Sequence, residues 1–281
     1  MARGATHRPP PTGPSVGSGW VRVPCPCVII TTRHGVELVL DDSGFDVAPW
    51  VYRPAMKDGW YEEDFLEHVW CLGRRGVYVD VGAHLGTATI WFGALCPATV
   101  VHAIEPVARY AEILRRNVAA NGLSDKVRVH QIGLGRARGT ATNHLPKEHQ
   151  VGFDGDVDTA VAVDETFPIR RLDEVVHGRI AVLKVDVEGM EADVLRGASR
   201  ILDWHRPIVY AEAWNARSVA DIDGVLRNFG YEATGRVFNA TPTYEFSAPA
   251  SRGLERLRPI WRRVPASVRK RMWAVRSGSP D

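Results

Sequence analysis

Short apolar segments alternate with amphipathic segments between residues 77 and 229 of the chain. The largely apolar segments lie at 77–81, 99–104, 127–132, 180–187 and 207–211, and their length and composition predict strands. Apolar residues recur instead at helical spacing in 87–95, 109–120, 191–202 and 219–229. Strands that alternate with helices in this way indicate parallel βαβ units in a doubly wound α/β sheet.

The segments on either side of this alternation predict further elements. Residues 27–32 and 36–40 flank Arg33-His34-Gly35 and are typical of a β-hairpin with a glycine turn. Residues 60–72 carry acids in their first turn and apolar residues on one face, which predicts a helix. Two β segments, 231–238 and 243–247, are expected to close the fold.

Three segments show less regular patterns. Residues 41–59 contain glycines and prolines throughout, so we expect a loop. Residues 133–167 are polar and rich in glycine without a clear period, with room for short strands. Residues 171–174 resemble the start of a short helix.

Composition changes this picture little. The chain has 281 residues, 45% of them hydrophobic and 24% charged, with a net charge of +2, which is ordinary for a globular protein and indicates no particular partner. The four cysteines, Cys25, Cys27, Cys71 and Cys96, contain no C-x-x-C pair, so we expect reduced thiols in a cytoplasmic protein. The sequence has no apolar run of 18 residues and no apolar signal-peptide core, so we expect neither a membrane span nor a signal peptide.

The composition also divides the chain into four expected parts. Residues 1–19 are rich in proline, glycine and serine and are expected to be disordered, and 20–59 form a hairpin-and-loop extension. Residues 60–248 form the main α/β domain, and 249–281 form a basic amphipathic tail. Between 252 and 276 this tail has nine Arg and Lys against one acid, Glu255. It could contact anionic lipid or a phosphorylated substrate or carrier, or it could be a solvated helix packed on its apolar stripe.

An acidic residue stands at or just after the end of four predicted strands. These residues are Asp80, Glu105, Asp186 and Glu212. Because the carboxyl ends of parallel strands meet at one edge of a doubly wound sheet, where ligands bind, we expect the four carboxylates to converge there. A glycine turn with Gly82 and Gly86 joins the first strand to its helix, and such a turn brings backbone N–H groups and a positive helix end to one point.

The turn and the acids narrow the identity of the ligand. The turn reads Gly82-Ala83-His84-Leu85-Gly86, so it lacks the second glycine of G-x-G-x-x-G, and no G-x-x-x-x-G-K-[ST] is present. Dinucleotides and nucleoside triphosphates therefore fit poorly. S-adenosylmethionine fits better, because its amino-acid end can lie against the turn and its ribose diol can donate two hydrogen bonds to Glu105.

At this point the sequence resembles the FkbM family of S-adenosylmethionine-dependent methyltransferases. The resemblance runs from about residue 60 to 215 and rests on DVGAHLGTAT, IEP, RRNVAANGL, RLDEV, LKVDVEGMEADVLRGA and PIVYAE. It implies a class I methyltransferase fold, a Rossmann-like sheet of seven strands with the last one antiparallel. It also implies O-methylation of a hydroxyl on a sugar, glycolipid or polyketide-type metabolite of secondary metabolism. The family usually has Asn at the position of His84.

These considerations give a set of expected site residues. The residues expected to contact the cofactor are Asp80, Gly82, His84, Gly86, Thr87, Glu105, Pro106 and Gly133. Asp186 is the first choice for the base that accepts the proton of the hydroxyl, with Glu188 second and Glu212 facing the same pocket. Lys184 has the same side-chain parity as Asp186 and could keep it ionised. Mg²⁺ held by Asp186 and Glu212 is an alternative that we do not favour, because Ala213 follows Glu212.

Three other functions remain open at this point. A nucleic-acid methyltransferase could use the basic tail, although the N/D-P-P-Y/F motif of amino-methylating enzymes is replaced here by Asp186-Val187-Glu188-Gly189. A nicotinamide-dependent oxidoreductase is opposed by the missing glycine. A non-catalytic binding module of the same fold is opposed by the intact set of acids at the strand ends.

Overall fold

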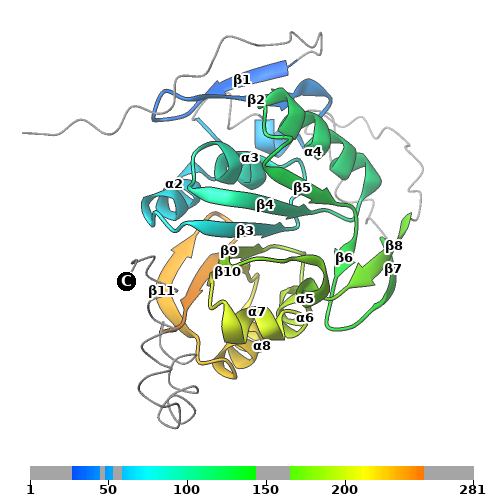
Figure 1. Cartoon of the computed structure of the whole chain (residues 1–281), viewed down its shortest axis with the longest axis vertical. Coiled ribbons are helices and arrows are strands. Elements are labelled where there is room, and N and C mark those ends of the chain that lie inside the picture. Colours follow the sequence, from blue (N-terminus) through cyan, green and yellow to red (C-terminus); the bar gives the residue numbers. More distant parts are fainter. Residues whose placement is uncertain (1–26, 45–47, 53–58, 144–164, 250–281) are drawn as a thin grey trace, which may run out of the picture.

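A seven-stranded sheet forms the centre of the protein in the computed structural model, which describes residues 27–44, 48–52, 59–143 and 165–249 (Figure 1). The order of its strands is β11-β12-β10-β9-β3-β4-β5. Their bounds are β3 Gly76–Val81, β4 Ala98–Ile104, β5 Val127–His130, β9 Ile180–Val185, β10 Ile208–Glu212, β11 Glu232–Phe238 and β12 Thr243–Ser247.

Five neighbouring strands of this sheet, from β5 to β10, run parallel to one another. Strand β12 is antiparallel to both of its neighbours, β10 and β11. The predicted class I methyltransferase topology is therefore confirmed, including the closing pair of strands and the antiparallel last strand. All six residues of β9 are buried, as expected for a central strand that is covered on both faces.

Helices cover both faces of the sheet (Figure 1). Helices α2 (Glu63–Cys71), α3 (Thr87–Ala94) and α4 (Ala108–Ala120) pack with one hydrophobic core. Helices α5 (Leu172–Val175), α6 (Glu191–Arg196), α7 (Ser199–Trp204) and α8 (Ala216–Arg227) pack with the other. None of the helices in the described part of the chain is long and apolar enough to cross a membrane.

The N-terminal hairpin is attached to helix α4. Its strands, β1 (Cys27–Thr31) and β2 (Glu37–Asp41), confirm the predicted hairpin. The side chain of Asn121, at the end of α4, accepts from the N–H of Val39 over 2.9 Å and donates to its carbonyl over 2.7 Å. Arg116 of α4 lies 2.8 Å from a carboxylate oxygen of Asp41. These polar contacts, together with the buried apolar residues of both strands, join the hairpin to the main core.

The loop predicted for residues 41–59 contains regular turns. A 3-10 helix, η1, spans Asp42–Gly44, and residues 49–52 are helical. The helix predicted from residue 60 begins at Glu63 instead, because Glu62 adopts a left-handed conformation with φ of 56° that an α-helix cannot contain.

The single helix predicted for residues 191–202 is wrong, because the chain forms α6 and α7 there. At the break between α6 and α7, a Cβ on Gly197 would overlap the backbone carbonyl of Gly135. The backbones at these two glycines are therefore in direct contact. The carboxylate of Asp173 accepts from the N–H groups of Arg200 and Ile201 at 2.9 and 3.0 Å, and thus caps the start of α7. These contacts come from distant residues, and helical periodicity does not reveal them.

A small second sheet occupies part of the glycine-rich region. Its strands are β6 (Gly133–Leu134), β7 (Gly139–Asn143) and β8 (Glu165–Arg170), in the order β6-β8-β7. They confirm that this region contains short strands. The expectations for residues 1–19, Cys25 and the basic tail at 252–276 lie outside the described residues.

Candidate active site

The register of two parallel strands places a lysine beside a buried acid. Asp80 of β3 is paired with Lys184 of β9, and the ammonium of Lys184 lies 3.7 Å from a carboxylate oxygen of Asp80. The other oxygen of Asp80 accepts a hydrogen bond of 2.6 Å from the hydroxyl of Thr89 in α3. Asp80 is fully buried and lies beside Lys184 as a counter-ion, and its predicted contact with a cofactor stays a prediction.

Lys184 also reaches Asp186, which directly follows β9. Its ammonium donates a hydrogen bond of 2.9 Å to the Asp186 carboxylate, so the predicted pairing is confirmed. Burial alone would lower the pKa of Lys184, but Asp186 and Asp80 raise it above its ordinary value. Burial would raise the pKa of Asp186, yet the charge and hydrogen bond of Lys184 hold it below the usual range. Both groups are therefore ionised at neutral pH.

Strand β10 delivers a second acid to the same place. Ala211 pairs with Val185, so Glu212 and Asp186 leave neighbouring strands at the same level. Glu212 is only 4% exposed, and its burial together with the nearby Asp186 raises its pKa to about 8. At neutral pH this carboxyl therefore keeps its proton and can donate it in a hydrogen bond to Asp186.

Three carboxylates converge at this edge of the sheet. Oxygen atoms of Asp186, Glu188 and Glu212 all lie within 4.8 Å of one another. Glu188 is exposed and has a left-handed backbone with φ of 55°. The set could in principle offer oxygen ligands to a divalent cation. The ammonium of Lys184 forms an ion pair with Asp186 in this cluster, and the alternative of a metal held by Asp186 and Glu212 stays a prediction.

The glycine turn lies against the end of β9. A Cβ on Gly82 would overlap the backbone carbonyl of Asp186, and a Cβ on Gly86 would overlap the side chain of Leu114 in α4. Both glycines have positive φ, 77° and 91°. The glycines thus allow the turn to pack on Asp186 and α4. Helix α3 starts directly after Gly86 without a side-chain cap, which leaves its first N–H groups for another acceptor.

Glu105 closes this turn from the end of β4. Its carboxylate accepts from the N–H of His84 at 2.9 Å and from the N–H of Val107 at 2.9 Å. Burial raises the pKa of Glu105 to about 7, although these two hydrogen bonds favour its ionised form. A carboxylate has about four acceptor positions, so two remain for the hydroxyls of a ligand.

His84 stands in the middle of the turn between two other rings. Its φ is 50°, an unusual value for a residue with a side chain. Its ring is nearly parallel to that of Trp50, with centroids 6.1 Å apart, and meets Tyr110 edge to face at 4.4 Å. Burial lowers the pKa of His84 to about 4, although the negative charge of Asp186 acts to raise it. His84 is therefore a neutral imidazole at physiological pH, able both to donate and to accept.

Two further groups near the acids come from the residues ahead of α2. Burial raises the pKa of Glu62 to about 7, while Lys184 lowers it, so Glu62 lies within electrostatic range of the site. The phenol of Tyr61 is influenced by the same charges and also has a raised pKa, chiefly from burial. Glu62 directly precedes α2 and brings a further acid into range of the site. Nothing in the sequence marked Tyr61 or Trp50.

The remaining predicted residues have mixed positions. Thr87 begins α3, and its carbonyl accepts from the indole N–H of Trp60 at 3.1 Å. Pro106 directly follows Glu105. Gly133 lies in β6, where a Cβ would overlap Ile169 and Phe167, so packing within the small sheet explains this glycine. The contacts predicted between these residues and a cofactor stay predictions.

Two further histidines have partners away from the acids. The ring of His130 lies 2.8 Å from that of His102 in the neighbouring strand. The ring of His205 accepts from the N–H of Ile180, at the start of β9. Both arrangements agree with structural roles.

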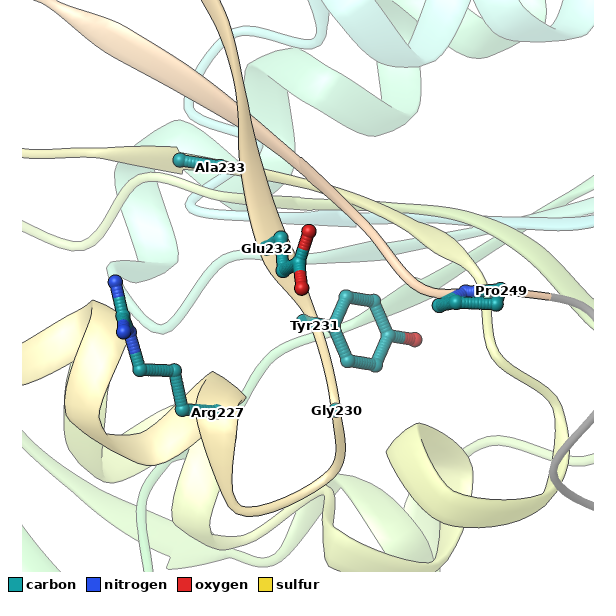
Figure 2. Close-up of a pocket in the computed structure, with 6 residues that line it drawn as sticks. All are labelled: Arg227, Gly230, Tyr231, Glu232, Ala233 and Pro249. Atoms are coloured by element: carbon teal, nitrogen blue, oxygen red, sulfur yellow. The ribbon is translucent and has the colours of Figure 1, made fainter.

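A hollow of about 480 Å³ lies at the opposite edge of the sheet (Figure 2). It is lined by Arg227, Gly230, Tyr231, Glu232, Ala233 and Pro249. Tyr231 donates a hydrogen bond to the carbonyl of Pro207, which directly precedes β10, whereas Glu212 stands where β10 ends. The hollow is therefore separate from the acid cluster.

Comparison with known proteins places the site within a family. The family model described as "Methyltransferase FkbM domain" matches residues 80–233, more than half of the chain. "Methyltransferase 1" of Beauveria bassiana (strain ARSEF 2860) is 29% identical over a match that covers 42% of this chain and 57% of that protein. "Methyltransferase sdnD" of Sordaria araneosa is 26% identical, with 62% and 82% covered.

Solved structures include methyltransferases as well. The crystal structure of an FkbM methyltransferase from Methylobacillus flagellatus KT has a TM-score of 0.47 and 20% identity, and the match covers 62% of this chain and 43% of that chain. A precorrin-6y C5,15-methyltransferase from Geobacter metallireducens GS-15 has a TM-score of 0.43 and 15% identity, with 68% and 89% covered.

Proposed function

The chain belongs to the FkbM family of methyltransferases, and we propose that it transfers a methyl group from S-adenosylmethionine to a hydroxyl of a small molecule. The observation that best supports this proposal is the hydrogen bond of 2.9 Å between Lys184 and Asp186 at the end of β9. It maintains an ionised carboxylate beside the glycine turn, where a hydroxyl that approaches the methyl group must lose its proton.

The residues around the turn fit the cofactor. The uncapped start of α3 offers N–H groups and the positive end of a helix to the cofactor carboxylate. The two acceptor positions left on Glu105 suit the two ribose hydroxyls. The neutral ring of His84 can contact the amino-acid end of the cofactor as donor or acceptor, in place of the usual Asn.

The reaction that follows from these residues is an in-line displacement. S-adenosylmethionine, when bound, supplies a methyl carbon whose bond to the sulfonium sulfur breaks, with its electrons kept by sulfur, as the acceptor oxygen bonds to that carbon. Asp186 orients the hydroxyl and accepts its proton. The low pKa of Asp186 makes it a weak base, but the hydroxyl becomes strongly acidic only as its oxygen forms the new bond, so position matters more than basicity.

Lys184 and Glu212 support Asp186 in this step. Lys184 stays protonated and favours the ionised form of Asp186 before the hydroxyl proton arrives. Glu212 carries its own proton at neutral pH and, by donating it to Asp186, helps to fix the position of the Asp186 carboxylate. Glu188 is exposed beside them and can bind a second hydroxyl of the acceptor.

The decisive experiment combines Asp186→Asn with the control Asp193→Asn, which removes an acid from an exposed pair with Arg196 on α6. Calorimetry with S-adenosylhomocysteine should give micromolar affinity for the wild type and both variants, and NADH should not bind. With labelled S-adenosylmethionine and a panel of hydroxylated glycans, glycolipids and polyketides, Asp186→Asn should lower turnover at least about a hundredfold. Unchanged turnover in Asp186→Asn would remove this residue from the mechanism, and binding of NADH alone would overturn the cofactor assignment.

A further inference from the structure

An exposed tryptophan is hydrogen-bonded to one member of the acid cluster. Trp214 lies two residues after the end of β10, and 55% of its surface is exposed to solvent. Its indole N–H donates a hydrogen bond of 2.9 Å to Glu212, the acid that approaches Asp186 and Glu188 to within 4.8 Å. The polar atom of Trp214 thus contacts the acid cluster while more than half of the residue remains exposed to solvent.

Two other exposed large apolar side chains in the described part of the chain belong to segments that contact or follow site residues. Trp50 stacks on His84, and Met190 lies two residues after Glu188. Together with Trp214 they make up three of the six large hydrophobic side chains that are exposed there, Ile29, Trp50, Met190, Trp204, Trp214 and Val237. An exposed indole leaves apolar area in water at a cost of about 25 cal/mol per Å², so a ligand that covers this face gains that free energy.

The chemistry of the surroundings defines what can cover the Trp214 face. The hydrogen bond to Glu212 fixes the ring, and a fixed aromatic face favours another ring stacked on it. Asp186 and Glu188 accept hydrogen bonds from hydroxyls but repel phosphate, sulfate or carboxylate groups. Lys184 does not offset this repulsion for a ligand, because it is 4% exposed and already paired with Asp80 and Asp186.

We propose that Trp214 is a specificity residue that seats an uncharged, hydroxylated ring of the acceptor, and that its N–H positions Glu212 within the acid cluster. This inference rests on the proposed hydroxyl methylation and narrows its acceptor to a class. A saturated polyol ring and a phenolic ring share the required chemistry. Anionic acceptors, including nucleic acids, are excluded from this seat.

The test compares two changes at Trp214 with one at a matched position. Trp214→Ala removes the ring and the N–H, and Trp214→Phe keeps a ring but removes the N–H. Trp204→Ala is the control, because Trp204 is 77% exposed and ends α7, next to the residues that precede β10. The wild type and all three variants are first shown to bind S-adenosylhomocysteine by calorimetry. Failure of the wild type at this step would contradict the proposed function itself, whereas the later steps test only the seat.

Binding to the protein saturated with S-adenosylhomocysteine is then measured by saturation-transfer NMR. The probes are methyl β-glucopyranoside for a polyol ring, 2-naphthol for a phenolic ring, and glucose 6-phosphate for an anionic ring. One uncharged probe should bind the wild type at least about tenfold more tightly than the phosphate, and Trp214→Ala should weaken it about five- to tenfold, the range of an aromatic stacking contact. Trp214→Phe should lose less than about threefold and Trp204→Ala nothing.

Several results would contradict the proposal that Trp214 binds an uncharged ring of the acceptor. They are binding of glucose 6-phosphate as tightly as the uncharged rings, binding of neither uncharged ring, and equal losses of affinity in Trp214→Ala and Trp204→Ala.

The proposed positioning of Glu212 by the Trp214 N–H is tested separately, by the carboxyl ¹³C titration of Glu212. Loss of the N–H donor in Trp214→Phe should move its midpoint to higher pH, because the ionised form loses a hydrogen bond. An unchanged midpoint would reject the positioning role.

Discussion

The ammonium of Lys184 and the carboxylate of Asp80 lie 3.7 Å apart, with only 5% and 1% of their side chains exposed to solvent. They are directly paired across β3 and β9, in the centre of the sheet. This buried pair supports the acid cluster, because the same ammonium also forms an ion pair with the carboxylate of Asp186. A buried charge that loses its partner is costly, whereas a complete pair is close to neutral for stability.

Lys184→Met should therefore destabilise the fold strongly. It leaves Asp80 buried without a counter-charge, and we expect a loss of about 3–5 kcal/mol in the free energy of unfolding, measured by urea denaturation. The matched control is the double variant Asp80→Asn/Lys184→Met, in which neither buried charge remains and a large part of the loss should be recovered. A loss below about 1 kcal/mol in the single variant would show that the pair is not buried in solution.

The close contact of Gly82 with the end of β9 predicts that a larger residue at this position destabilises the fold. Gly82→Ala should cost at least about 3 kcal/mol in unfolding free energy, because the new methyl group overlaps the carbonyl of Asp186 in addition to the strain of a φ of 77°. Gly122→Ala is the control, since Gly122 has a φ of 66° but nothing within 4 Å of an added Cβ. It should cost about 1–2 kcal/mol from strain alone. Equal losses in the two variants would argue against the close approach at Gly82.

The acids of the site predict how stability depends on pH. Burial together with Asp186 raises the pKa of Glu212 from the ordinary 4.5 to about 8, so the folded state holds a proton that the unfolded chain releases between these values. Its stabilising contribution is complete below pH 4.5 and is lost as the pH rises through 8. Glu62 and Glu105, each with a pKa raised to about 7, act in the same direction.

Above pH 6.5, where the lowered pKa of buried His84 no longer changes stability, unfolding free energies measured up to pH 8.5 should consequently decline, by at most about 1.4 kcal/mol per pH unit for each such carboxyl. Glu212→Gln removes one of these titrating carboxyls, so the unfolding free energy of this variant should decline less steeply with pH than that of the wild type. Glu232→Gln, at an exposed acid of β11, should reproduce the wild-type slope. Parallel curves for all three proteins would contradict a shifted pKa at Glu212.

The strands and the acids at their ends were predictable from the sequence, because period and burial fix the parallel sheet and parallel strands end at one edge. Lys184 pairing with Asp186 followed from side-chain parity alone. The role of Asp80 did not, since the pairing of β3 with β9 joins residues far apart in the chain. The same limit applies to Trp50, Tyr61 and Glu62, which reach the site from outside the repeating pattern, and to the helix break at Gly197, which depends on its contact with Gly135.

The position of β12 between β10 and β11 has a consequence for synthesis of the protein on the ribosome. Strand β11 emerges first, yet its partner in the sheet is β12, which ends at Ser247. Until that residue has left the exit tunnel, β10 presents an open edge, and exposed edges of this kind pair readily with other chains. Nascent chains stalled before residue 243 should therefore be the species that aggregate, and chaperones that bind them there would protect the folding of the protein.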